Sequence, residues 1–319
     1  MAQSLKVKEN SATWAASTQS RIPLSRNYHV ENYLVKIKVT HDNGATPVFY
    51  NEGVFSLINN IQLIGNGNEN IKQMPANKLY IDSILRSGKN GGNSLDTTAN
   101  KTGLTSYVWA RINLSMPNSV RPWDTILWTK PFQSLDLMID WASSANIGSN
   151  ITVTAAEMTV FSNQLIGYSR AKGEVIKYYE ETALKEEVTG TNAQLTFNLP
   201  VNKLYRAISI VSTINGLRAD TVINSIKLKS GQTVFCDWDA EAFNEHNKET
   251  YRIESSTDFK GIYVVDFAER GRLSDMLNTI VAQGGYNTLE LVLNVTKQTG
   301  SNFVDVYFDT VKQTTATEV

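Results

Sequence analysis

The segment INNIQL at residues 58–63 returns as INSIKL at residues 223–228, an offset of 165 (223 − 58). A second segment, FQSLDLMI at 132–139, returns in the same order as YNTLELVL at 286–293, an offset of 154 (286 − 132). Segments that recur in order at nearly constant spacing indicate an internal duplication. The repeated unit has roughly 150 residues, an ordinary domain size, so the sequence predicts two similar domains in tandem.

Composition allows two hydrophobic cores and excludes several classes of protein. The 319 residues are 41% hydrophobic, and the formal net charge of −1 gives no general argument for binding nucleic acid or a membrane surface. The chain has no apolar run of about 18 residues and no apolar signal segment near its start. Its one cysteine, Cys236, cannot form an internal disulfide, which favours synthesis in a reducing compartment.

The spacing of apolar residues predicts strands in both halves. YLVKIKVT at 33–40 and AQLTFNL at 193–199 alternate between apolar and polar residues, as half-buried strands do. Two short helices are expected at corresponding places, over 75–86 and 239–249. The charge-dense run EVIKYYEETALKEEVTG at 174–190 is interpreted as a connector between the two halves, with helix as one option.

We therefore expect an all-β protein built of two tandem eight-stranded jelly rolls with short helical insertions. The predicted divisions are an N-terminal arm at 1–28, a first jelly roll at 29–165, a connector at 166–190, a second jelly roll at 191–312 and a C-terminal tail at 313–319.

No catalytic constellation is found. The histidines His29, His41 and His246 stand apart and in no HExxH spacing, Cys236 has no CxxC partner, and no GxSxG elbow occurs. The glycine-rich stretch at 65–70 lacks the GxxxxGK[ST] pattern of a phosphate loop, and we interpret it as a hairpin turn. The sequence predicts no catalytic residue, no cofactor and no metal.

One acidic cluster leaves an alternative open. Asp237, Asp239, Glu241 and Glu245 lie near His246 around the start of the second predicted helix. Acidic residues in a first helical turn are favoured by the helix dipole, which accounts for Asp239 and Glu241. A divalent-cation site made with loop oxygens is the alternative, and calcium suits it better than zinc.

Two segments carry a family resemblance. GIYVVDFAERGRLSDMLNT at 261–279 and VNKLYRAISIVSTINGLRADTVINSIKL at 201–228 resemble the second barrel of double jelly-roll major capsid proteins. Such proteins build icosahedral virions around an internal lipid membrane, as in corticoviruses and tectiviruses. The resemblance covers about residues 30–312.

This resemblance implies a viral structural protein without enzymatic activity. It implies a homotrimer whose three pairs of barrels form a pseudo-hexagonal block, and blocks of this kind tile an icosahedral shell around the membrane. The partners it implies are neighbouring capsomers, minor capsid or penton proteins and the viral internal membrane, without direct sequence-specific binding of nucleic acid. The expected location is the capsid shell of a bacteriophage virion assembled in the host cytoplasm.

The predicted arm is the candidate for membrane contact. It carries Lys6, Lys8, Arg21 and Arg26 against Glu9 alone, a local excess of +3 (4 − 1) on a chain whose total is −1. Positive charge near anionic headgroups is attractive, so the arm is predicted to face the virion interior and the membrane. The alternative is an arm that only links neighbouring capsomers through hydrogen bonds.

A competing function fits the same composition. A two-domain β-sandwich binding module, such as a glycan-binding adhesin or a phage tail protein, would also show duplication and exposed tryptophans. The mass in solution separates the two functions, because a capsid protein should form a stable trimer without a glycan ligand.

Overall fold

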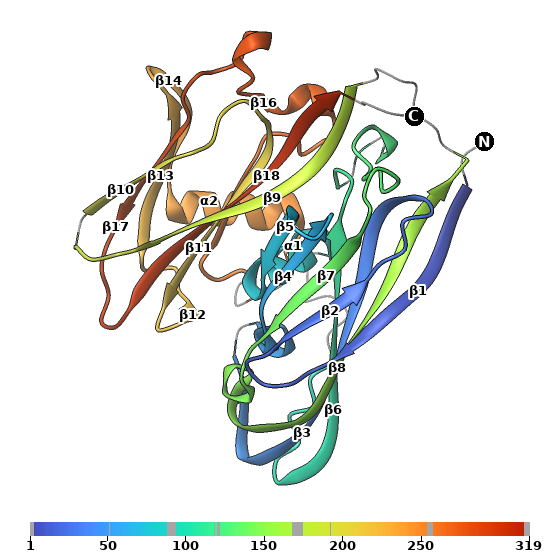
Figure 1. Ribbon diagram of the computed structural model, residues 1–319. Helices are drawn as coiled ribbons and strands as arrows, with labels where there is room; N and C mark the ends of the chain where they lie inside the picture. The colour runs from blue at the N-terminus through green and yellow to red at the C-terminus, as the bar shows by residue number, and fades with distance from the viewer. Residues whose placement is uncertain are drawn as a thin grey trace. The chain divides into compact units, whose positions relative to one another are not determined.

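The computed structural model describes residues 3–50, 52–87, 94–117, 119, 122–167, 175–191, 193–253 and 258–315 (Figure 1). The chain divides into two compact units. The first comprises residues 1–117, 121–179 and 314–319, and the second comprises residues 118–120 and 180–313.

The first unit is built of two antiparallel sheets, with strand orders β1-β8-β3-β6 and β5-β4-β7-β2 among the described residues. Helix α1 (Ala76–Ser87) follows β5. The strands are β1 Gln3–Thr13, β2 Gln19–Pro23, β3 His29–Phe49, β4 Ile58–Gly65, β5 Glu69–Pro75, β6 Lys101–Asn113, β7 Leu135–Trp141 and β8 Gly148–Ile166. Short 3-10 turns are η1 Gly53–Leu57, η2 Pro122–Asp124 and η3 Ser144–Asn146.

The second unit repeats this plan. One sheet has the order β10-β17-β13-β14; in the other, β11 lies between β18 and the short strands β12, β15 and β16, and β9 follows β18. The strands are β9 Val175–Glu187, β10 Ala193–Asn198, β11 Leu204–Ile214, β12 Leu217–Arg218, β13 Ile223–Ser230, β14 Thr233–Asp239, β15 Ile262–Asp266, β16 Leu277–Asn278, β17 Glu290–Val295 and β18 Asn302–Thr315. Residues 175–179 of β9 and 314–315 of β18 belong to the first unit. Helix α2 is Ala240–Tyr251, and the 3-10 turns are η4 Leu273–Asp275 and η5 Val281–Gln283.

The repeated segments INNIQL and INSIKL occupy equivalent strands, β4 and β13. The two strands have the same sequence of buried and exposed positions. The β4–β7 ladder shifts register between Ile58 and Asn60, and the β13–β17 ladder shifts between Ile223 and Ser225. The offset of 165 that relates the sequences therefore relates these two β-bulges as well.

A second bulge is also duplicated. The β4–β5 ladder shifts between Leu63 and Ile64, and the β13–β14 ladder shifts between Leu228 and Lys229. Because a one-residue slip would turn each strand's apolar side chains to the other face, matching bulges keep the same side chains inside. Across the units, β2-β7-β4-β5 corresponds to β10-β17-β13-β14, and β1-β8-β3-β6 corresponds to β9-β18-β11-β15. The prediction of two tandem jelly rolls is confirmed.

Both repeated hairpins end in an exposed turn. Gly67 lies in the turn between β4 and β5, and Gly231 in the turn between β13 and β14. Each has a positive φ, 80° and 53°, which glycine adopts without steric cost. The stretch at 65–70 is thus a hairpin turn, as the sequence predicts.

The core of the second unit is a contiguous cluster contributed by both sheets. Ile226 of β13 and Leu293 of β17 belong to the same buried cluster as Ile210 of β11 and Val306 of β18. Phe243 of α2 joins this cluster and anchors the helix. Each such side chain contributes about 1.5–3 kcal/mol when fully buried, so these alternating positions stabilise the sandwich.

The predicted N-terminal arm at 1–28, called the lead-in below, contains two strands. Residues 3–13 form β1, which pairs with β8, and residues 19–23 form β2, which pairs with β7. Both are outermost strands in the strand orders of the described residues, and Ala12 is the only buried side chain on β1. An outer strand of this kind needs no apolar face, so period-two hydrophobicity did not reveal it.

The connector is also a strand. Residues 175–187 form β9, beside β18, so the helical option for this segment is wrong. Two smaller expectations also differ. The β-branched and apolar run at 54–64 predicts one strand, but its first residues, 54–57, lie in η1. The predicted tail at 313–319 begins inside β18, and residues 316–319 lie outside the described part.

Candidate assembly surfaces

The β1 strand presents two lysines to solvent. Lys6 lies opposite Asn163 and Lys8 opposite Phe161 in the β1–β8 ladder, and both side chains are exposed. Because alternate residues of a strand share a face, the two ammonium groups lie on the same side of β1. Within the part of the chain that the structure describes, neither forms an ion pair.

The acidic residue of the lead-in, Glu9, fixes β1 in place. Its carboxylate accepts hydrogen bonds from Ser162 Oγ at 2.5 Å and Gln164 Nε2 at 3.0 Å, both on β8. It also accepts one from the backbone N–H of Ser25 at 3.2 Å, beyond β2. The Glu9 carboxylate therefore bonds to neighbouring groups of the first unit and forms no ion pair with Lys6 or Lys8 among the described residues.

The two arginines of the lead-in make contacts within the first unit. Arg21 of β2 donates to the carboxylate of Asp136 on β7, and this hydrogen bond and charge raise the pKa of Arg21. Arg26, which follows β2, donates to the backbone carbonyl of Phe132. The structure thus separates the four predicted residues into two pairs, Lys6 with Lys8 and Arg21 with Arg26. Their role in membrane contact stays a prediction.

The acidic cluster of the second unit is dispersed into ion pairs. Asp237 on β14 accepts from Lys227 Nζ at 2.8 Å, and Glu245 accepts from Lys248 Nζ at 2.8 Å. Asp239 stands at the N-cap of α2 without a side-chain capping bond. The described residues contain no group of three or more acidic, histidine or cysteine side chains placed to hold a metal ion.

The lone cysteine, His41 and His246 are placed by packing and hydrogen bonding. Burial raises the pKa of Cys236 to about 11, which keeps the thiol protonated. The adjoining Asp42-Asn43-Gly44 predicts a turn at His41. Instead His41 lies in β3, fully buried between Asn43 Oδ1 and Ser106 Oγ, each 2.8 Å from a ring nitrogen. His246 lies on α2, 3.8 Å from Glu269, and its ring stands edge-on to that of Trp238.

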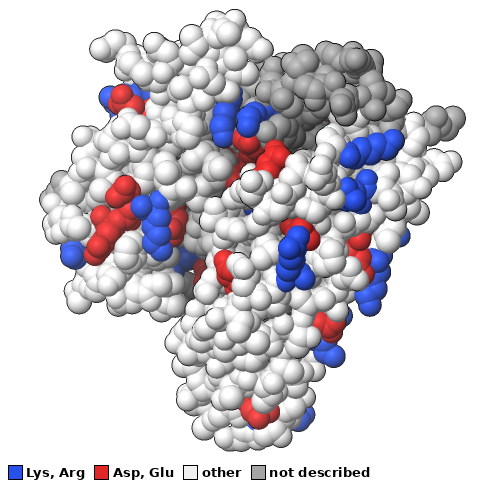
Figure 2. Space-filling model, in the orientation of Figure 1, with Lys and Arg blue, Asp and Glu red and all other residues white. Residues whose placement is uncertain are grey.

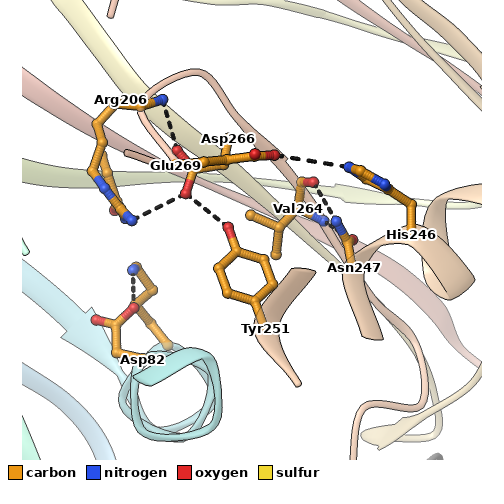
Figure 3. A network of polar contacts seen from close by, with 11 residues as sticks. Asp82, Arg206, His246, Asn247, Tyr251, Val264, Asp266 and Glu269 are labelled. Carbon is orange, nitrogen blue, oxygen red and sulfur yellow. Dashed lines mark hydrogen bonds and ion pairs between the residues drawn. The ribbon is translucent and has the colours of Figure 1, made fainter. Parts of the chain in front are cut away.

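A buried polar network attaches α2 to the sheet of the second unit (Figure 3). Arg206 of β11 donates to Asp266 of β15 at 3.0 Å and to Asp309 of β18 at 3.5 Å. The Tyr251 hydroxyl at the end of α2 donates to Asp266 at 2.7 Å. One helical turn earlier, Asn247 donates to the carbonyl of Val264 and accepts from its N–H.

Sequence reasoning missed this network. The available signal was a charged residue inside an otherwise apolar strand: Arg206 in YRAISIV and Asp309 in FVDVYFDTV. Such a residue is buried only when it is paired. The network is structural, because its buried members hold α2 against strands β11, β15 and β18.

Charge is interspersed on the face of the molecule shown in Figure 2, without a continuous basic region among the residues drawn there. The described helices include none with the length and hydrophobicity of a membrane span. This face therefore presents local charges and no single dominant charged patch among the residues drawn.

Comparison with known structures identifies the fold. The Sulfolobus turreted icosahedral virus major capsid protein aligns with a TM-score of 0.72 at 15% identity, over 97% of this chain and 96% of that one. The major capsid protein P2 of bacteriophage PM2 aligns at 0.63 and 12% identity over 98% of both chains. The PBCV-1 virus capsid aligns at 0.65 and 12% identity, over 100% and 97%. The fold is that of double jelly-roll capsid proteins.

Sequence similarity relates the second half of the chain to a known family. Residues 176–314 match the family model described as viral coat protein P2 C-terminal domain, and no curated protein matches the chain in sequence. The matched segment covers less than half of the chain, and together with the fold it makes this chain similar to viral major capsid proteins, which are structural components of virion shells. The binding-module alternative is not favoured.

Proposed function

We propose that three copies of the chain form a capsomer of six jelly rolls, and that these pseudo-hexagonal blocks tile an icosahedral shell around a lipid membrane. The observation that supports this is the repetition of strand order and of both bulges in the two units. Three chains with two similar units supply six similar blocks around one axis, and closed rotational symmetry is the usual form of homo-oligomers. Blocks with sixfold character leave the fivefold vertices to minor capsid or penton proteins.

Light scattering of the purified chain tests the trimer. We expect a mass near 106.5 kDa, three times the 35.5 kDa of one chain, at micromolar concentration. Each contact between copies should bury more than about 2,000 Å², as in obligate assemblies. Addition of glycans should leave the mass unchanged. A 35.5 kDa monomer under these conditions contradicts the proposal.

Lipid contact is proposed for the cationic lead-in of the first unit. Arg21 lies in β2 and Arg26 follows it. Their guanidinium groups are suited to binding phosphate headgroups. Lys6 and Lys8 lie on an outer strand, where contact with a neighbouring copy is the competing role.

Glutamine substitutions test the lipid contact. Particles with Lys6, Lys8, Arg21 and Arg26 all changed to Gln should lose lipid as salt is raised, and the two pairs changed separately show which carries the effect. Normal assembly with lipid retained at raised salt would make the membrane role wrong.

A further inference from the structure

Strand β14 has an open outer edge. It is the last strand of the order β10-β17-β13-β14 and has β13 as its one neighbour among the described residues. Its side chains are exposed or half-buried along the whole strand, with Val234 and Trp238 exposed by 48% and 45%. An open edge presents unpaired N–H and C=O groups to any strand that can align with them.

The equivalent edge in the first unit is covered. Strand β5, the counterpart of β14, has β9 as a further neighbour in its sheet. Lys72 of β5 is only 2% exposed and its Nζ lies 4.2 Å from the ring of Tyr179 on β9, both residues belonging to the first unit. The first unit thus has an additional strand at this edge, and no strand takes the corresponding place beside β14 among the described residues.

The duplication indicates which strand would fill the gap. Strand β9 lies beside β18, and its counterpart beside β8 is β1. The backbone continues alike after each: Trp14 N donates to Ala156 O on β8, and Val188 N donates to Asn302 O on β18. If β9 covers β5, the strand equivalent to it, β1, is the one suited to cover β14. The β1 strand of the same chain pairs only with β8 among the described residues, so a second copy must supply it.

Charge supports the same pairing. The C-terminal half of β14 borders an open groove of about 1050 Å³ whose lining includes Asp237, Asp239, Glu245 and Glu249. Asp237 already pairs with Lys227 and Glu245 with Lys248, so Asp239 and Glu249 carry the remaining negative charge of the groove. Lys6 and Lys8 on β1 are two residues apart, as are Asp237 and Asp239 on β14, so each pair shares one face of its strand. Opposite charges across neighbouring strands stabilise pairing and select the partner.

We propose that β1 of one copy adds to the open edge of β14 in a second copy by backbone hydrogen bonds, with Lys6 and Lys8 against the acidic groove of Asp237 and Asp239. The proposal rests on the proposed trimer and supplies its contact: each copy gives one strand and receives one, which closes a ring. It assigns the lysine pair to contact between copies and leaves Arg21 and Arg26 for lipid.

Charge exchange tests the contact. In sedimentation of the full-length protein over a range of concentrations, Lys6→Glu with Lys8→Glu should weaken trimer formation at least about tenfold. Asp237→Lys with Asp239→Lys should do the same, and all four changes together should restore association to within about threefold of wild type. Lys101→Glu with Lys130→Glu, at two exposed positions of the first unit, is the matched control and should leave association unchanged.

Hydrogen exchange gives a second measurement that does not depend on substitution. Backbone amides of β14 should be protected in the wild-type trimer and should exchange rapidly after dilution to monomer. Unchanged protection of the β14 amides on dilution overturns the contact. So does a variant with all four charge reversals that associates no more strongly than either double variant. If Lys6→Glu with Lys8→Glu releases lipid from particles without altering association, the lysines face the membrane and this contact is wrong while the trimer stands. A wild-type monomer would instead overturn the proposed function itself.

Discussion

At the scale of single residues, Gly261, in the segment that carries the family resemblance, is a position that only glycine fits. Its φ is +68°, and a Cβ there would lie 2.7 Å from Ala219 N and 2.9 Å from Ser212 O. Its N–H donates to Asp220 Oδ1 at 2.6 Å, just before β15 begins. Glycine is needed both for the backbone conformation and for the close approach of a neighbouring strand.

Gly261→Ala should therefore lower the free energy of unfolding by about 2–4 kcal/mol, from backbone strain plus steric overlap. Gly67→Ala is the control, because Gly67 has a φ of +80° but nothing within 4 Å of the added Cβ, and it should cost about 1 kcal/mol. Urea unfolding monitored by fluorescence measures both. Equal losses for the two variants would show that close packing around Gly261 has no effect.

At the scale of elements, the sequence predicted what faces the core and missed what lies at the edges. Helices expected over 75–86 and 239–249, at corresponding places in the two repeats, are present as α1 and α2 within about two residues. Strands β1 and β9 lie in the predicted arm and connector, and they hold equivalent positions beside β8 and β18. The apolar period of a sequence does not show which strands pair with each other. The places of β1 and β9 depend on long-range hydrogen bonds, so the sequence did not predict them.

Glu9 should control how firmly β1 is held. Glu9→Ala removes the acceptor of Ser162, Gln164 and the Ser25 N–H, so amides of β1 should exchange with deuterium faster by about tenfold, equivalent to about 1–2 kcal/mol of local stability. Ser11→Ala, at an exposed position of the same strand, is the matched control. Unaltered exchange in the Glu9 variant would mean that the backbone ladder alone holds the strand.

At the scale of the whole molecule, duplication was the most informative property of the sequence, and the buried polar chemistry was the least accessible. Repeated apolar segments predicted two jelly rolls because their spacing survives divergence. Arg206 with its two carboxylates, Asp266 and Asp309, became visible only once three strands were placed side by side. The same holds for the separation of the four lead-in cations, which are close in sequence but engage different sheets.

Buried tyrosines should make the molecule sensitive to alkali. Burial raises the pKa of Tyr33, Tyr205 and Tyr263 above the ordinary value of 10.0, and burial together with Asp266 raises that of Tyr251. A raised folded-state pKa contributes stability that is complete below pH 10 and is lost as pH rises further, because the unfolded chain releases its protons first. Each tyrosine contributes a slope of up to about 1.4 kcal/mol per pH unit.

Tyr251→Phe should reduce the fall of the free energy of unfolding with pH, measured between about pH 9 and 11, by the contribution of one tyrosine. It also removes the hydrogen bond to Asp266, which lowers stability at neutral pH by about 1–2 kcal/mol. Tyr286→Phe, at a position 38% exposed, is the control and should retain the wild-type slope. An unchanged slope for Tyr251→Phe would mean that this hydroxyl ionises equally in the folded and unfolded chain.

The exposed hairpin ends at Gly67 and Gly231 have a practical consequence. Nothing lies within 4 Å of an added Cβ at either glycine, and the adjoining strands are fixed by their own ladders. Exposed turn tips of this kind accept inserted sequence with little loss of stability. Each chain therefore offers two attachment points for a foreign peptide, and a particle built from many copies would display that peptide as a dense, regularly spaced antigen array.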